Sequence, residues 1–192
     1  GQVQEAMGIS EQIARSARRM GSMITALASL AQVSREPLRR LSLDMGAIVQ
    51  ETWTLLAASN PDRRAELRLS VLPTAQADPA LAAQVWQNLL DNAAKYSARS
   101  ERPLVAVDSY RDARGTWYRV ADNGVGFDRA KAQGLFQPFQ RMHAGNQYEG
   151  QGVGLSLVRR IVQHHGGEIR LRSAPGVGTV AEFTLDPAPA AS

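Results

Sequence analysis

Four polar side chains lie on one face of a segment, residues 79–97, that otherwise has the apolar pattern of a buried helix. They are Asn88, Asp91, Asn92 and Lys95, which at 100° per residue share about a third of the helix circumference. The apolar residues of the segment fall on the opposite side: Trp86, Leu90, Ala93 and Ala94. Asparagine is unfavourable inside helices because its amide competes for backbone hydrogen bonds, so two of them indicate a ligand.

The chemistry that these side chains offer is that of a magnesium and phosphate site. Amide and carboxylate oxygens are hard ligands suited to Mg²⁺, and a lysine one turn further on can offset phosphate charge. A solvated helix face is the alternative interpretation of the same four residues.

A second polar motif, "VADNGVGFD" at residues 120–128, ends a predicted strand in Asp122 and places glycines at 124 and 126. The Asp-Asn-Gly triplet alone is typical of a turn, since asparagine and glycine tolerate positive φ. A calcium loop is disfavoured because the acidic residues do not alternate and no closing glutamate follows.

A third motif, "GQGVGL" at residues 150–155, opens a predicted helix. Backbone N–H groups and the helix dipole at such a position can hold phosphate oxygens. The motif lacks the Lys-Ser/Thr ending of a Walker loop. It also differs from the dinucleotide fingerprint, because Leu155 stands where the third glycine should be and no convincing strand precedes it.

The elements that must position these motifs follow from periodicity and turn signals. Residues 10–33 have apolar positions three and four apart, which predicts an amphipathic helix with a coiled-coil or bundle seam, or one packed on its own domain. Pro37 ends that pattern and marks a domain boundary. Asp44 and Asp78 are predicted N-caps. The further predicted elements are a helix to about Ser59 with apolar Ile48, Val49, Leu55 and Leu56, strands at 65–72, 104–110 and 116–121, helices at 79–97 and 155–165, and a hairpin of 168–173 with 180–185.

This order of elements predicts an α/β sandwich, in which one mixed sheet is covered by helices on one face. The composition limits the function classes further. The 192 residues are 44% hydrophobic and 21% charged and include no cysteine, which excludes disulfides and thiolate metal sites. The net charge of +4 comes from scattered arginines rather than a basic stripe, which argues against nucleic-acid binding. No apolar run approaches the roughly 18 residues of a membrane span, so we expect no direct membrane contact.

The three motifs, in this order and with "LFQPF" (135–139) between the second and third, resemble the N, G1, F and G2 boxes of the ATP-binding domain of sensor histidine kinases. These kinases belong to the GHKL superfamily, with gyrase, Hsp90 and MutL, and the resemblance implies their Bergerat-type α/β sandwich. Residues 17–51 resemble the second helix of the dimerisation and phosphotransfer hairpin with its linker. Residues 135–169 are especially similar to the kinase modules of bacteriophytochromes.

The resemblance implies a division into three parts and a set of roles. Residues 1–36 would be part of the hairpin, 37–187 the ATP-binding domain and 188–192 a disordered tail. Asn88 and Asn92 would hold Mg²⁺ at the ATP phosphates, Lys95 would contact a phosphate, and Tyr96 would pack near adenine and ribose. Asp122 would accept a hydrogen bond from the adenine amino group, which selects adenine over guanine.

Further implied roles concern the loops. Gly124 and Gly126 would let the backbone approach the base. The remaining implied residues would form or anchor a lid over the phosphates: Phe136, Phe139, Arg141, Gly150, Gly152, Val153, Gly154 and Leu155. Phe136 and Phe139 could equally be core residues, and Arg141 could equally be a surface arginine rather than a γ-phosphate contact.

The sequence departs from the family in its histidines, which are His143, His164 and His165. None lies on the N-terminal helix, where the resemblance would place a phospho-acceptor, and surface or capping roles are expected for them. We therefore expect a fragment of a longer cytoplasmic or membrane-anchored receptor that binds ATP and Mg²⁺ but does not phosphorylate itself. Its partners would be a response-regulator receiver domain and, through the N-terminal helix, a second copy of the longer protein.

Two other functions fit the sequence. One is a kinase-like interaction module that binds nucleotide without phosphotransfer. The other is a different GHKL protein, either an ATPase or a serine kinase, which the hairpin-like helix disfavours.

Overall fold

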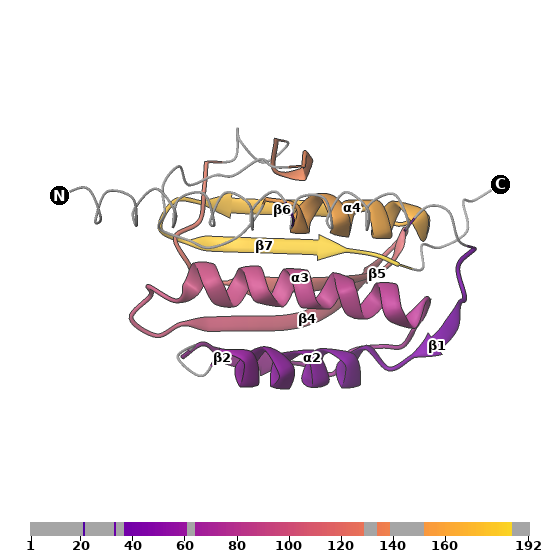
Figure 1. The fold of residues 1–192 in the computed structure, drawn as a ribbon, viewed down its shortest axis with the longest axis horizontal. Helices are drawn as coiled ribbons and strands as arrows, with labels where there is room; N and C mark the ends of the chain where they lie inside the picture. Colours follow the sequence, from indigo (N-terminus) through magenta and orange to yellow (C-terminus); the bar gives the residue numbers. More distant parts are fainter. Residues whose placement is uncertain are drawn as a thin grey trace, which may run out of the picture.

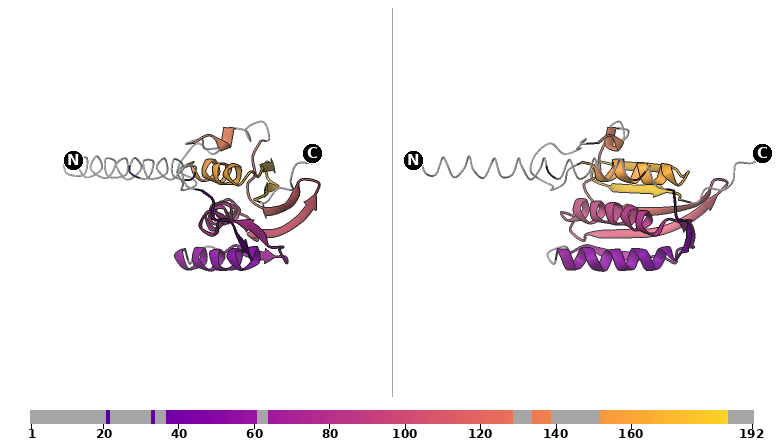
Figure 2. Two further views of the ribbon diagram at one scale, coloured as in Figure 1. Left: turned by 90° about the vertical axis from the view of Figure 1, so that its right-hand side faces the viewer. Right: turned by 45° about the vertical axis from the view of Figure 1, so that its right-hand side comes forward.

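The computed structural model describes residues 21, 33, 37–60, 64–128, 134–138 and 152–185. A five-stranded sheet carries the helices on one of its faces (Figures 1 and 2). The elements are β1 (Leu41–Leu43), α2 (Met45–Ser59), β2 (Glu66–Leu69), β3 (Ala75–Ala77), α3 (Pro79–Ser97), β4 (Leu104–Asp112), β5 (Gly115–Asp122), α4 (Gly154–His164), β6 (Ile169–Ala174) and β7 (Gly178–Phe183).

The strand order is β2-β4-β5-β7-β6. The β2–β4 pair is parallel and the β4–β5, β5–β7 and β6–β7 pairs are antiparallel. The predicted mixed sheet with helices on one face is thus confirmed. The predicted helix over residues 10–33 and the predicted tail at 188–192 lie outside the described residues, apart from the single positions 21 and 33.

Helix α3 is the centre of the core, and it begins and ends where the sequence predicts. Asp78 caps it by accepting hydrogen bonds from the backbone N–H groups of Ala80 (3.1 Å) and Leu81 (3.2 Å), and Pro79 fills the first position, where no N–H partner is needed. Trp86 is fully buried and meets the rings of Tyr118 and Phe183 edge-on, at centroid distances of 5.8 and 5.0 Å. The apolar side of α3 therefore faces the sheet.

Two predicted details differ from the structure. The strand predicted over 65–72 ends at Leu69, and Val71 is 98% exposed, because alternation alone does not show where a partner strand ends. Leu55, predicted as an apolar helix position, is 62% exposed, whereas Val49 is buried. The sequence pattern does not predict the small sheet of β1 and β3, since strands of three residues have too few positions to show a period.

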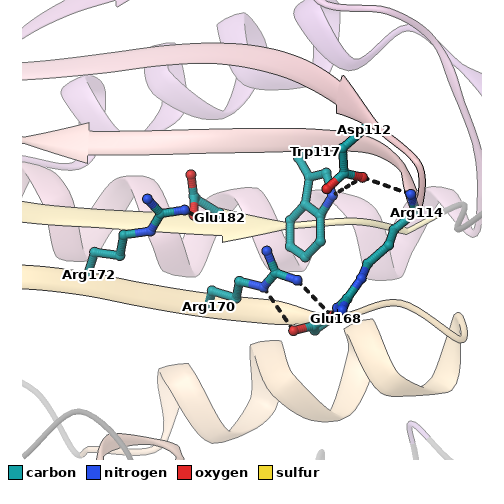
Figure 3. Close-up of polar contacts among 7 residues, drawn as sticks. All are labelled: Asp112, Arg114, Trp117, Glu168, Arg170, Arg172 and Glu182. Atoms are coloured by element: carbon teal, nitrogen blue, oxygen red, sulfur yellow. Dashed lines mark hydrogen bonds and ion pairs between the residues drawn. The ribbon is translucent and has the colours of Figure 1, made fainter.

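The sheet face opposite the helices is covered by its own polar side chains (Figure 3). Trp117 is fully buried although none of the described helices covers it: its Nε1 donates to Asp112 Oδ1 at 2.9 Å, and the Arg170 guanidinium lies 4.0 Å from the ring centroid. Glu182, buried on the neighbouring strand, accepts a hydrogen bond from Arg172 Nη2 at 2.7 Å. Cross-strand neighbours of this kind close the face without a second helical layer.

The predicted surface or capping role of His165 is only partly right. His165 is the C-cap residue of α4, as a capping role implies, but it is only 1% exposed rather than at the surface. Its Nε2 accepts a hydrogen bond from the backbone N–H of Asp78 at 3.1 Å, and its Nδ1 contacts the Ile161 carbonyl oxygen at 2.8 Å. These two bonds require the neutral ring with the proton on Nδ1.

The environment of His165 predicts a loss of stability at acidic pH. Burial lowers the pKa of His165, the charges of Arg40 and His164 lower it further, and the Ile161 carbonyl and the Asp78 charge oppose the shift. Because the unfolded chain takes up this proton first, the contribution of His165 to the free energy of unfolding is present above about pH 6.5 and decreases as the pH falls below that value. We expect His165→Gln, which keeps an acceptor but does not titrate, to lose less thermal stability than wild type between pH 7.5 and 5.5. An equal decrease in melting temperature for the two proteins over this pH range would contradict this.

None of the helices in the described part of the chain is both long enough and apolar enough to span a membrane.

Candidate functional site

The first and third sequence motifs meet in the structure at the start of α4. A Cβ atom built on Gly154 would lie 2.6 Å from Asn88 Oδ1 and 3.8 Å from Asn92 Nδ2. Asn88 also donates from its Nδ2 to the Gln84 carbonyl oxygen at 2.7 Å, which leaves the Oδ1 side of the amide facing α4. A side chain at 154 would have to displace the Asn88 amide, so glycine lets the start of α4 approach it without that shift.

The polar face of α3 is half-buried, as a binding face rather than a fully solvated one would be. Asn88, Asp91, Asn92 and Lys95 all have intermediate exposure, while the residues on the other side of the helix are buried. The Lys95 ammonium lies 4.8 Å from the centroid of the Tyr96 ring. This contact holds the cation over the last turn of α3.

Among the described residues, no side chain caps the first turn of α4. Val153 is the N-cap residue and makes no side-chain hydrogen bond to the turn, and the Ser156 hydroxyl is donated back to the Val153 carbonyl oxygen at 2.7 Å. Gly152 has a φ of +71°, a left-handed conformation that favours glycine. A loop of this shape directs backbone donors and the positive end of the helix dipole toward the same region as Asn88 and Asn92.

Asp122 lies half-buried at the end of β5. Its Oδ1 accepts hydrogen bonds from the backbone N–H groups of Gly124 (2.9 Å) and Thr179 (3.2 Å). Burial raises the pKa of Asp122 to about 6, although the two N–H donors favour the carboxylate. Both bonds reach the same oxygen, so Oδ2 is left to accept a hydrogen bond from a ligand.

The second motif is fixed between α3 and the β6–β7 hairpin. A Cβ on Gly124 would lie 2.4 Å from the Tyr96 carbonyl oxygen, and the Val125 N–H donates to that oxygen at 3.3 Å. Gly126 has a φ of +58°, and a Cβ there would lie 2.0 Å from the Ala174 carbonyl oxygen. The second motif thus contacts α3, the helix that carries the first motif and that the start of α4 also approaches.

Two residues of this site are not predicted from the sequence: Gly178 and Thr179, at the start of β7. Gly178 has a φ of +119°, and a Cβ on it would lie 1.9 Å from the Asp122 carbonyl oxygen. Thr179 supplies one of the two N–H groups that hold Asp122. The sequence "APGVGT" indicates only a turn, and no local pattern predicts a contact between residues that are 57 positions apart.

The predicted lid residues are only partly described. Phe136 is half-buried, and the Arg159 guanidinium of α4 lies 5.3 Å from its ring centroid, so it contacts the helix that begins at the third motif. Leu155 packs against the core and Val153 is buried. Phe139, Arg141, His143 and Gly150 lie outside the described residues.

The donor set of the site fits a magnesium nucleotide. Within the part of the chain that the structure describes, no group of three or more histidine, cysteine, aspartate or glutamate side chains could hold a metal by itself. Two neutral amide oxygens beside a helix N-terminus suit instead a Mg²⁺ ion whose other ligands are phosphate oxygens and water. Gly124, Gly126 and Gly178 make room for the protein's own backbone, and Asp122 Oδ2 is the atom of this part of the site that could accept from a ligand.

A family model described as "Histidine kinase-, DNA gyrase B-, and HSP90-like ATPase" matches residues 77–189. Among similar proteins, the adaptive-response sensory kinase SasA of a Synechococcus species is 33% identical over 174 residues, which are 88% of this chain and 46% of SasA. The phytochrome-like protein Cph1 of a Synechocystis species is 29% identical over 166 residues, 86% of this chain and 22% of Cph1. The chain thus spans less than half the length of these two relatives.

Solved structures show the same fold. The mycobacterial sensor histidine kinase MprB aligns with a TM-score of 0.64 and 24% identity, over 78% of this chain and 99% of that one. Full-length ShkA, in complex with AMPPNP, aligns with a TM-score of 0.72 and 22% identity, over 93% of this chain and 38% of that one.

Proposed function

Since this chain belongs to the histidine kinase-, DNA gyrase B- and HSP90-like ATPases and carries their ATP-binding domain, we propose that it is the catalytic part of a two-component sensor histidine kinase. The observation that carries the proposal is the close approach of Gly154 to the side chains of Asn88 and Asn92. It brings the anion-attracting start of α4 to two amide ligands for Mg²⁺, as a bound triphosphate requires.

The base end of the site would be Asp122. Its Oδ2 would accept a hydrogen bond from the adenine amino group, whereas guanine presents a carbonyl oxygen at that place. Tyr96 and the backbone at Gly124 and Gly126 would border the base. The structure of ShkA with AMPPNP, an ATP analogue, supports nucleotide binding by this fold.

The phosphate end would be formed by α3 and the loop before α4. Asn88 and Asn92 would hold Mg²⁺, which when bound withdraws charge from the phosphate oxygens. Lys95 and the backbone N–H groups of the first turn of α4, with Gly150, Gly152 and Arg141, would hold and neutralise the phosphates. Catalysis by this chain would then consist mainly of positioning and charge neutralisation.

The γ-phosphoryl group would pass to a histidine nitrogen of a longer protein, with ADP as the leaving group, and then to an aspartate of a response-regulator receiver domain. Both partners are part of the proposal, as is a homodimer of the longer protein formed through the N-terminal helix. We place this activity in the cytoplasm, where ATP and receiver domains are found.

The test is a calorimetric titration of the chain with ATP, with and without Mg²⁺, and with GTP as the control. Adenine-selective binding that Mg²⁺ strengthens is the expected result. Equal affinity for GTP, or no binding of either nucleotide, would overturn the proposal.

A carboxylate in place of Asn92 should change the metal dependence of binding. We expect Asn92→Asp to weaken ATP binding without Mg²⁺ by about tenfold, because a carboxylate beside phosphates costs on the order of 1 kcal/mol even when solvent screens it. Because the new carboxylate is itself a Mg²⁺ ligand, Mg²⁺ should restore affinity more strongly than in wild type. Isothermal titration over a series of Mg²⁺ concentrations measures both effects.

The matched control is Gln87→Glu, which makes the same amide-to-acid change at an exposed position of α3. If both variants respond to Mg²⁺ like wild type, Asn92 is not a metal ligand.

A further inference from the structure

A second contact between α3 and α4 lies at the end of the helices opposite the nucleotide site. The His165 ring, just after α4, accepts a hydrogen bond from the N–H of Asp78, just before α3. Arg40 donates from Nη2 to the His165 carbonyl oxygen at 2.7 Å and from Nη1 to the Gln76 carbonyl oxygen at 3.1 Å. We call Arg40, Asp78 and His165 the helix joint.

The helix joint also fastens the segment that leads into the domain. The Arg39 backbone N–H donates to Asp78 Oδ2 at 3.2 Å, and β1 pairs with β3, which runs directly into Asp78. Figure 1 shows β1 at the end of the helical layer, away from the ends of β5 and β7 that approach the site. The segment 37–43 is therefore attached to both helices at one point.

The two contacts between α3 and α4 are separated by nearly the same length along each helix. Asp78 lies ten residues before Asn88, and His165 lies eleven residues after Gly154. At a rise of 1.5 Å per residue, both stretches span about 15 to 16 Å. Because a packed helix moves largely as a rigid rod, a shift of α4 at His165 is carried to Gly154.

We propose that the helix joint is a positioning element of the nucleotide site: Arg40 and His165 set the place of α4 along α3 and thereby hold the loop 152–154 against Asn88 and Asn92. Through Arg40, the segment 37–43 can act on the phosphate end without touching the nucleotide. The effect on ATP rests on the proposed function, whereas the effect on the position of α4 does not.

Arg40 is the better of the two residues for a test, because it belongs to an exposed segment and its loss removes no core volume. Its neighbour Arg39 offers a matched control, since it is also exposed and contributes only its backbone N–H to the joint. The variants Arg40→Met and Arg39→Met remove the same charge one residue apart. Both keep an unbranched side chain of similar length.

The first measurement is the amide spectrum of the nucleotide-free protein by NMR. We expect Arg40→Met to shift the Nδ2 signals of Asn88 and Asn92 and the backbone signal of Gly154, which lie about 15 to 21 Å along the helices from Asp78 and His165. Arg39→Met should leave all three signals in place. Unshifted signals in a folded Arg40→Met protein would overturn the proposal, and this result needs no bound ligand.

The second measurement compares two ligands, ATP with Mg²⁺ and adenosine. Adenosine would contact only the base end, at Asp122, Tyr96 and the backbone at Gly124 and Gly126, so its affinity should not change. For Arg40→Met we expect the affinity for ATP with Mg²⁺ to fall about tenfold, within the range typical of coupling between two sites. Equal losses for both ligands, or no loss for either, would contradict the proposed positioning.

His165 gives an independent check. Gln can place an acceptor near the position of Nε2, so His165→Gln should keep the wild-type ratio of ATP affinity to adenosine affinity. His165→Leu removes the acceptor, so its ratio should fall as it does in Arg40→Met. If the Leu variant does not fold, the two arginine variants still decide the question. If the wild-type protein bound no ATP, the proposed function would be wrong. The NMR signals would still test whether the helix joint positions α4.

Discussion

Asp122→Asn is expected to weaken ATP binding by about 100-fold, because a hydrogen bond to a charged acceptor contributes ~1.5–3 kcal/mol and the new amide would turn a donor toward the adenine amino group. The Asn Oδ1 can still accept the two N–H groups that now reach Asp122 Oδ1, at 2.9 Å from Gly124 and 3.2 Å from Thr179. The loop should therefore keep its shape. Isothermal titration with ATP and with adenosine measures the effect, which should be equal for the two ligands.

The suitable control is Asp108→Asn, which removes the same charge from a half-buried aspartate on β4 that pairs with Arg119 instead. It should bind ATP like wild type. An unchanged affinity in Asp122→Asn would remove Asp122 from the base contact and leave adenine selectivity without a cause.

The same substitution should stabilise the nucleotide-free protein at neutral pH. Burial raises the pKa of Asp122 to about 6, so the folded state holds this carboxylate at a cost that disappears when the carboxyl takes up a proton. Its effect on stability is therefore most favourable below the ordinary aspartate pKa of about 4 and is lost as the pH rises through about 6. We expect Asp122→Asn to melt above wild type at pH 7.5, with the difference shrinking toward pH 4.5.

Gly126→Ala is expected to destabilise the fold by about 2–4 kcal/mol, the sum of a left-handed backbone strain and the displacement of packed atoms. Gly126 has a φ of +58°, and the new Cβ would lie 2.0 Å from the Ala174 carbonyl oxygen. Backbone atoms cannot turn aside as a side chain can, so the loop 122–126 and the β6–β7 hairpin must separate. Thermal unfolding should show a melting temperature lower by roughly 5–15 °C.

Gly176→Ala separates the two causes. Gly176 has a φ of +75°, but a Cβ there would meet no atom within 4 Å. Gly176→Ala should lose only the free energy of unfolding that comes from backbone strain, about 1 kcal/mol. If the two variants melted at the same temperature, the close approach of Gly126 to Ala174 would not contribute to stability.

Local sequence signals determined much of the fold and the outline of the site. The Asp78-Pro79 pair and the apolar spacing that follows predict α3 from Pro79 to about Ser97, because a cap, a first-turn proline and a 3.6-residue period all act within one helix. The same period predicts that Asn88 and Asn92 share a half-buried face opposite Trp86. The motif resemblance then identified the family, and the roles assigned to the individual site residues stay predictions.

The tertiary structure alone decided which distant segments hold those residues in place. His165 accepts from Asp78 across 87 positions, Arg40 reaches His165 across 125, and Thr179 fixes Asp122 across 57. These contacts join backbone groups to side chains, and a backbone N–H or carbonyl has no residue type that a pattern could reveal. The sequence therefore determined the helix that carries the polar face and the order of the three motifs, whereas chain folding decided how closely the glycine loops approach that helix and which distant backbone groups bond to Asp122 and His165.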